Sequence, residues 1–106
     1  MRYQLVLQWP AVSEADCDRL ISLEEMIEDR LGNIGIVDGH DFGFGEMNIF
    51  VHTDKPKSVF EKIIALPAVR KNLQQLKAGH RDFEEDEHTA VYPDGLKHFR
   101  LFRNFL

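Results

Sequence analysis

The first residues of the chain alternate between apolar and polar side chains, as in a half-buried strand. One face of residues 2–9 would carry Tyr3, Leu5, Leu7 and Trp9. The other face would carry Gln4, Val6 and Gln8. Pro10 ends the pattern because proline cannot donate a hydrogen bond to a neighbouring strand. The period of two predicts a strand over residues 2–9.

The pattern then changes to the spacing of a helix. The hydroxyl of Ser13 can cap a helix, and acidic residues at 14 and 16 suit the positive end of the helix dipole. Gly32 is a natural residue just beyond a helix C-terminus. Apolar side chains recur near helical spacing at Cys17, Leu20, Ile21, Ile27 and Leu31. We therefore expect a helix over residues 13–31, with Cys17 as a small hydrophobic residue on its buried side.

A hairpin and a second helix are predicted next. Residues 33–40 and 46–53 favour strands, and the glycine-containing stretch 41–45 would connect them as a hairpin. A second helix begins near Asp54 and should be interrupted at Pro67, since proline cannot continue a helix ladder.

The last third of the chain has a weaker pattern. Residues 77–83 and 88–92 favour strands on either side of a solvated acidic run at 84–87. Residues 96–106 fit either a helix or a strand. The order strand, helix, strand, strand, helix, strand predicts an α+β protein with a ferredoxin-like βαββαβ sandwich and a C-terminal extension. In such a fold both helices cover one face of an antiparallel sheet.

Composition and charge narrow the partners. A chain of 106 residues can build one hydrophobic core but not two, which predicts a single domain over residues 1–106. The formal charge of −5, without a lysine and arginine cluster, argues against nucleic acid as a partner. No run approaches about 18 apolar residues, which argues against a membrane span. The single Cys17 agrees with a reducing compartment, so we expect a cytoplasmic protein.

Polar side chains gather in the predicted hairpin. If its turn centres on Gly43, His40 lies opposite Glu46, and Asp38 lies opposite Asn48. This register places these four residues on the sheet face that the helices leave open. An apolar strip would lie beside them, formed by Val6, Ile34, Ile36 and Phe50. A bulge near the turn would shift this geometry by one residue.

Three interpretations of this surface remain open. The polar residues can simply suit a solvated hairpin end. The apolar strip can be an interaction face. Finally, His40 with Asp38, Asp41 or Glu46 can form an acid and base pair or bind a metal ion. Because the spacing matches no standard metal motif, and the glycines lie between strands rather than before a helix, no metal and no cofactor are predicted.

The leading hypothesis is a small binding protein whose partner is another protein or a second copy of itself. Its binding residues would lie on the open sheet face and in the hairpin, at Ile36, Phe42, Phe44, Asn48 and Phe50. The alternative is a small hydrolase or isomerase with His40 as general base, oriented by Asp38 or Glu46. The apolar residues of the segment 96–106 also need burial, and the open sheet face is the nearest large surface that could bury them.

A resemblance supports the layout but assigns no chemistry. The block Val-Asp-Gly-His-Asp-Phe-Gly-Phe-Gly-Glu-Met-Asn-Ile-Phe-Val-His-Thr-Asp at residues 37–54 resembles one in short bacterial proteins of unassigned function. The arrangement of the whole chain is similar to that of ferredoxin-like domains. The resemblance implies no catalytic role for Asp38, His40 or Glu46.

Overall fold

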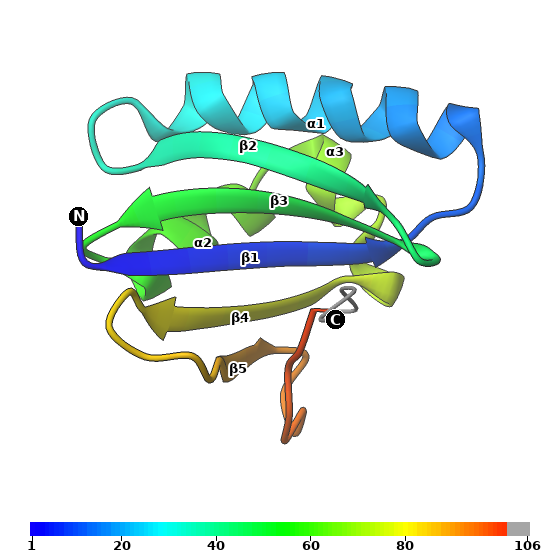
Figure 1. Ribbon diagram of the computed structural model, residues 1–106. Helices are drawn as coiled ribbons and strands as arrows, with labels where there is room; N and C mark the ends of the chain where they lie inside the picture. The colour runs from blue at the N-terminus through cyan, green and yellow to red at the C-terminus, as the bar shows by residue number, and fades with distance from the viewer. Residues whose placement is uncertain (102–106) are drawn as a thin grey trace.

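The computed structural model describes residues 1–101, which form an antiparallel five-stranded sheet with its helices on one side (Figure 1). The elements are β1 (Tyr3–Pro10), α1 (Glu14–Leu31), β2 (Ile36–Gly43), β3 (Glu46–Thr53), α2 (Pro56–Ile64), α3 (Pro67–Arg70), a 3-10 turn η1 (Leu73–Gln75), β4 (Lys77–Asp82) and β5 (Thr89–Tyr92). The strand order is β2-β3-β1-β4-β5, and every neighbouring pair is antiparallel. The predicted α+β class is confirmed. No helix among these residues is long and apolar enough to cross a membrane.

Helix α1 begins and ends where its sequence indicates. Ser13 is the N-cap, and its hydroxyl accepts a hydrogen bond of 3.3 Å from the backbone N–H of Asp16. The Asp16 carboxylate in turn accepts bonds from the backbone N–H groups of Val12 and Ser13, at 2.9 and 3.2 Å. The Val12 bond is the main reason why the pKa of Asp16 is lowered. Gly32 follows the helix at a φ of 56°, which a residue with a side chain rarely adopts.

The sheet separates two apolar clusters. The larger one lies between the sheet and the helices. It includes Leu5, Leu7 and Trp9 of β1, Leu20 and Ile27 of α1, Met47, Ile49 and Val51 of β3, and Val59 and Ile63 of α2. The alternation predicted for the first strand is confirmed, since Leu5, Leu7 and Trp9 belong to this cluster while Val6 belongs to the other one.

The second cluster lies on the opposite face, which we call the open face, and it is covered by the C-terminal segment (residues 96–101). Phe99 of this segment is 6% exposed and packs with Val6 and Phe50, while Leu96 and Leu101 pack at the margin. Phe50 is therefore only 7% exposed, and the expectation of an exposed apolar strip for partner binding is wrong at this residue. Residues 96–101 contain neither helix nor strand, and the rest of the predicted element, 102–106, lies outside the described residues.

A glycine in β4 admits the Phe99 ring to the sheet. A Cβ atom built on Gly79 would lie 2.5 Å from Cγ of Phe99, which is closer than real Cβ contacts. Gly79 pairs with Val6 of β1, so the ring rests directly on the middle of the open face. The absence of a side chain at Gly79 thus allows the C-terminal segment to cross the sheet at this level.

We predict that Phe99→Ala lowers the free energy of unfolding by about 3 kcal/mol, because it removes a buried ring and leaves a cavity. Gly79→Ala should also destabilise the fold, by about 1–3 kcal/mol, since the new methyl group displaces the ring. In the Phe99→Ala background the Gly79→Ala change should cost much less. Urea denaturation of the two single variants and the double variant measures all three values.

The matched control is Val12→Ala, because Val12 is 86% exposed and should change the free energy of unfolding by less than about 0.5 kcal/mol. Strictly additive effects of Gly79→Ala and Phe99→Ala would contradict the packing of Phe99 on Gly79.

Candidate functional site

The hairpin between β2 and β3 turns at Phe44 and Gly45, whereas the predicted turn centred on Gly43. Gly43 pairs with Glu46, so only two residues form the loop. Both have positive φ, 57° for Phe44 and 80° for Gly45, as in the primed turns that match the twist of a hairpin. The carbonyl of Gly45 accepts a 3.0 Å bond from the N–H of Ala11, which fixes the tip against the end of β1.

The turn exposes apolar side chains on one end of the molecule. Phe44 is 70% exposed and Phe42 is 40% exposed. Val12 is 86% exposed, and it follows Ala11, whose N–H bonds to the turn. We call these three residues, Val12, Phe42 and Phe44, the hairpin-tip patch. Phe42 and Phe44 thus present aromatic rings to solvent near the tip.

A β-bulge in β2 changes the predicted faces. Val37 pairs with Val51, but Gly39 pairs with Phe50, so Asp38 is an extra residue without a partner in β3. Beyond the bulge, His40 pairs with Ile49, whose side chain lies in the helix-side core. The expectation that His40 shares the open face with Asp38, Glu46 and Asn48 is therefore wrong.

His40 has a different acidic neighbour from those expected. Its Nδ1 atom lies 2.9 Å from Oε2 of Glu24, a residue of α1. Neither Asp38 nor Glu46 orients the imidazole. The sequence holds no local signal for this pair, because 16 residues separate its members and only the packing of α1 beside β2 joins them.

Three polar residues of the hairpin, Asp41, Glu46 and Asn48, form a partly buried network on the open face. Asn48 is 1% exposed, and its Nδ2 atom donates 2.8 Å bonds to Oδ1 of Asp41 and Oε2 of Glu46. Gln8 donates from Nε2 to the same Glu46 oxygen, at 3.0 Å, and to the carbonyl of Arg100, at 3.2 Å. Asn48 is therefore not a surface contact residue. The network instead anchors the C-terminal segment to β1 and β3.

Two predicted residues lie at the other end of β2. Ile36 is 58% exposed and pairs with His52, so it lies on the open face away from the hairpin tip. Asp38 Oδ2 lies 3.4 Å from Nε2 of His52 without a hydrogen bond, so the two groups attract each other only when the imidazole is protonated.

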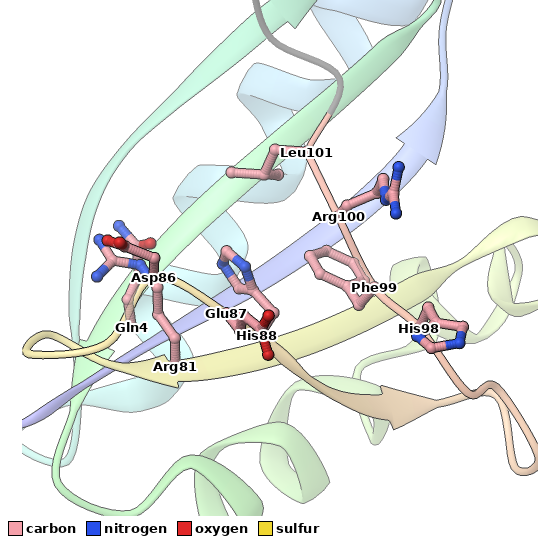
Figure 2. A pocket seen from close by; sticks show the side chains of 9 residues that line it. All are labelled: Gln4, Arg81, Asp86, Glu87, His88, His98, Phe99, Arg100 and Leu101. Atoms are coloured by element: carbon pink, nitrogen blue, oxygen red, sulfur yellow. The ribbon is translucent and has the colours of Figure 1, made fainter. Parts of the chain in front are cut away.

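The C-terminal segment leaves part of the open face uncovered, and a cavity of about 860 Å³ lies there (Figure 2). We call it the open-face cavity. Its lining comes from β1, β4, the loop between β4 and β5, and the C-terminal segment, namely Gln4, Arg81, Asp86, Glu87, His88, His98, Phe99, Arg100 and Leu101. The ring centroids of His88 and Phe99 are 5.3 Å apart. The sequence predicts no role for His88 or His98, since no local pattern joins these two residues to β1 and β4.

A smaller cavity of about 330 Å³ lies beside the start of α2. Its lining includes Tyr3, Lys57 and His80. The Nδ1 atom of His80 is buried and has no hydrogen-bond partner among residues 1–101. Burial lowers the pKa of His80, and the nearby Lys57 charge lowers it further.

The lowered pKa of His80 predicts a loss of stability in mild acid. As the pH falls below about 6.5, His80 becomes protonated in the unfolded chain while it stays neutral in the folded protein. The free energy of unfolding should therefore decrease as the pH falls through the folded pKa. Urea denaturation at about pH 7, 6 and 5 should show a shallower decrease for His80→Gln than for the parent protein.

The exposed His98 gives a matched control, since His98→Gln should keep the parent pH dependence. An identical pH profile for His80→Gln and the parent protein would show that His80 is not responsible.

Comparisons with protein-family models, with curated proteins and with solved structures find no match to this chain. Within residues 1–101, no three His, Cys, Asp or Glu side chains gather closely enough to hold a metal ion. The two candidate functional surfaces are thus the hairpin-tip patch and the open-face cavity.

Proposed function

We propose that this chain is a cytoplasmic binding domain that contacts another protein through the hairpin-tip patch. One observation carries the proposal: Phe44 is 70% exposed and sits at a φ of 57°. A non-glycine residue with this backbone conformation costs about 1–2 kcal/mol, and asparagine or glycine usually occupies such a turn position. In the isolated chain the exposed Phe44 ring buries little apolar surface, so it offsets little of this strain. Burial of the ring against a partner would offset it.

The surroundings of the hairpin-tip patch support a partner with a basic surface. Helix α1, which begins two residues after Val12, contains seven acidic and two basic residues and so has a formal charge of −5. The whole chain also has a charge of −5, so the rest of the sequence is neutral in sum. In Figure 1 the N-terminal end of α1 lies at the same end of the molecule as the β2–β3 turn. A second copy would meet like charge there, whereas a basic protein would be attracted.

The strand order supports a ferredoxin-like assignment. The first four strands lie in the order β2-β3-β1-β4, and β5 extends the sheet beyond β4. In this assignment β5 and the C-terminal segment are additions to the βαββαβ plan. Fold class defines no activity by itself, so the functional proposal depends on the surface.

The alternative of a hydrolase or isomerase with His40 as general base has one supporting observation. Glu24 holds Nδ1 of the imidazole, which leaves Nε2 available for proton transfer. However, neither of the two cavities described above is lined by His40. The binding proposal is therefore the better supported of the two.

Photo-cross-linking tests the binding proposal. We expect that replacing Phe44 by p-benzoylphenylalanine in the producing cell gives a covalent adduct with one other protein on irradiation. The expected adduct contains a protein with a basic surface. When a lysate of these cells is irradiated instead, high salt added beforehand should lower the amount of adduct. Mass spectrometry of the adduct identifies the partner.

Phe83 provides the matched control, because it is also an exposed phenylalanine, at 39%, and follows β4 at the opposite end of β1. The same photoreactive residue at position 83 should give no such adduct. Failure to cross-link at position 44, or equal adducts at both positions, would refute the binding role of the hairpin tip. An adduct of twice the chain mass would show a second copy as the partner.

A further inference from the structure

The open-face cavity has the size and position of a small-molecule site. Its volume of about 860 Å³ lies within the range of about 300–1,000 Å³ that ligand pockets occupy. The cavity lies on the opposite face of the sheet from α1 and is separate from the hairpin-tip patch. A ligand bound here would therefore be a second function, independent of the proposed protein contact.

Arg81 provides a fixed cation at this cavity. Its Nη1 atom donates to the backbone carbonyls of Phe83 and Glu85, at 3.5 and 3.0 Å, and its guanidinium lies 5.4 Å from the centre of the Phe83 ring. A guanidinium has five N–H donors, and those on Nε and Nη2 bond to no residue within 1–101. No carboxylate among these residues forms an ion pair with it. A guanidinium held in this way is ready to bind a carboxylate through its free donors.

Anionic groups line the same cavity. Asp86 and Glu87 are exposed in the loop between β4 and β5, and neither forms an ion pair within the described part of the chain. Figure 2 shows Arg81 and Asp86 toward one end of the cavity and Arg100 and His98 toward the other. With two arginines and two acids, the lining is neutral in sum. It therefore suits a ligand that carries both charges better than a simple anion or cation.

Apolar and amide groups complete the site. The rings of His88 and Phe99 lie between the two ends of the cavity, and the less buried His88 ring offers a surface against which a ligand side chain can pack. The Gln4 side chain adds an amide that makes no hydrogen bond to another residue within 1–101. An amide with both donor and acceptor atoms is complementary to a peptide group.

We propose that the open-face cavity binds a short zwitterionic peptide, with Arg81 receiving the terminal carboxylate at one end of the cavity and Glu87, which lies toward its middle, receiving the terminal ammonium. The His88 ring, which is less buried than the neighbouring Phe99, packs against a ligand side chain. The C-terminal segment thus has two roles, since it closes the apolar centre of the open face and forms one wall of this site.

Three small probes test the proposal on the intact protein. They are the dipeptide alanyl-phenylalanine, its carboxy-terminal amide and its N-acetyl derivative. In a titration followed by ¹H–¹⁵N NMR, the dipeptide should give saturable shifts at Arg81, residues 86–88 and residues 98–101. The amide and the acetyl derivative each lack one terminal charge, and each should bind about tenfold more weakly or worse.

A protein variant locates the carboxylate. Arg81→Gln should lower the affinity for the dipeptide about tenfold, because the carboxylate loses its contact with Arg81. The affinity for the amide should not change, because the amide has no carboxylate that Arg81 could bind. The control Arg70→Gln changes an exposed arginine of α3, outside this cavity, and should leave all affinities unchanged. If the Arg81 change alters the fold, the comparison of the three probes on the parent protein still decides the question.

Three results would overturn the proposal: no saturable shifts with the dipeptide, equal affinities for the three probes, or shifts confined to other surfaces. None of these results bears on cross-linking at position 44, so the peptide site and the protein contact can fail separately.

Discussion

The pairing of β2 with β3 determines where the hairpin residues of this molecule point. The two-residue turn at Phe44 and Gly45 sets the register at one end, and the bulge at Asp38 shifts it by one residue at the other. Since side chains alternate across a strand, the register that the turn sets places His40 opposite Ile49 on the helix side, while Asn48 lies on the open face. The candidate catalytic group of the sequence is therefore divided between two sides of the sheet. The same register places Phe44 at the tip, in a strained conformation and exposed to solvent.

The open face shows a second constraint, which is the covering of an antiparallel sheet that has helices on one side only. Phe99 occupies the space above Gly79 and closes the apolar centre of this face, and Gln8 ties the segment down through the carbonyl of Arg100. The cover is partial, so a polar hollow remains between the segment and the β4–β5 loop. The molecule therefore presents an apolar hairpin tip near an acidic helix at one surface and a charged cavity at another. Each surface has its own chemistry, and each is the basis of a separate proposal for binding.

Local patterns predicted the elements whose formation depends on near neighbours. The alternation of β1 and the Ser13 cap of α1 lie within a few residues, and the structure confirms both. The predicted hairpin register was wrong for two reasons. Phenylalanine is an unusual first residue of such a turn, and nothing in the sequence marks Asp38 as a bulge. The contacts of Glu24 with His40 could not be predicted, since they depend on how α1 packs beside β2. The sequence indicated that the C-terminal residues need burial, but the place where they pack depends on a glycine in a distant strand.

The central claim is that Phe44 serves binding rather than the stability of the hairpin. The free energy of unfolding of Phe44→Asn, measured by urea denaturation against the parent protein, tests this claim without knowledge of the partner. Asparagine suits the positive φ at this position, so we expect the variant to be more stable by about 1 kcal/mol. A loss of stability of similar size would mean that the Phe44 ring supports the folded hairpin, and would contradict the claim.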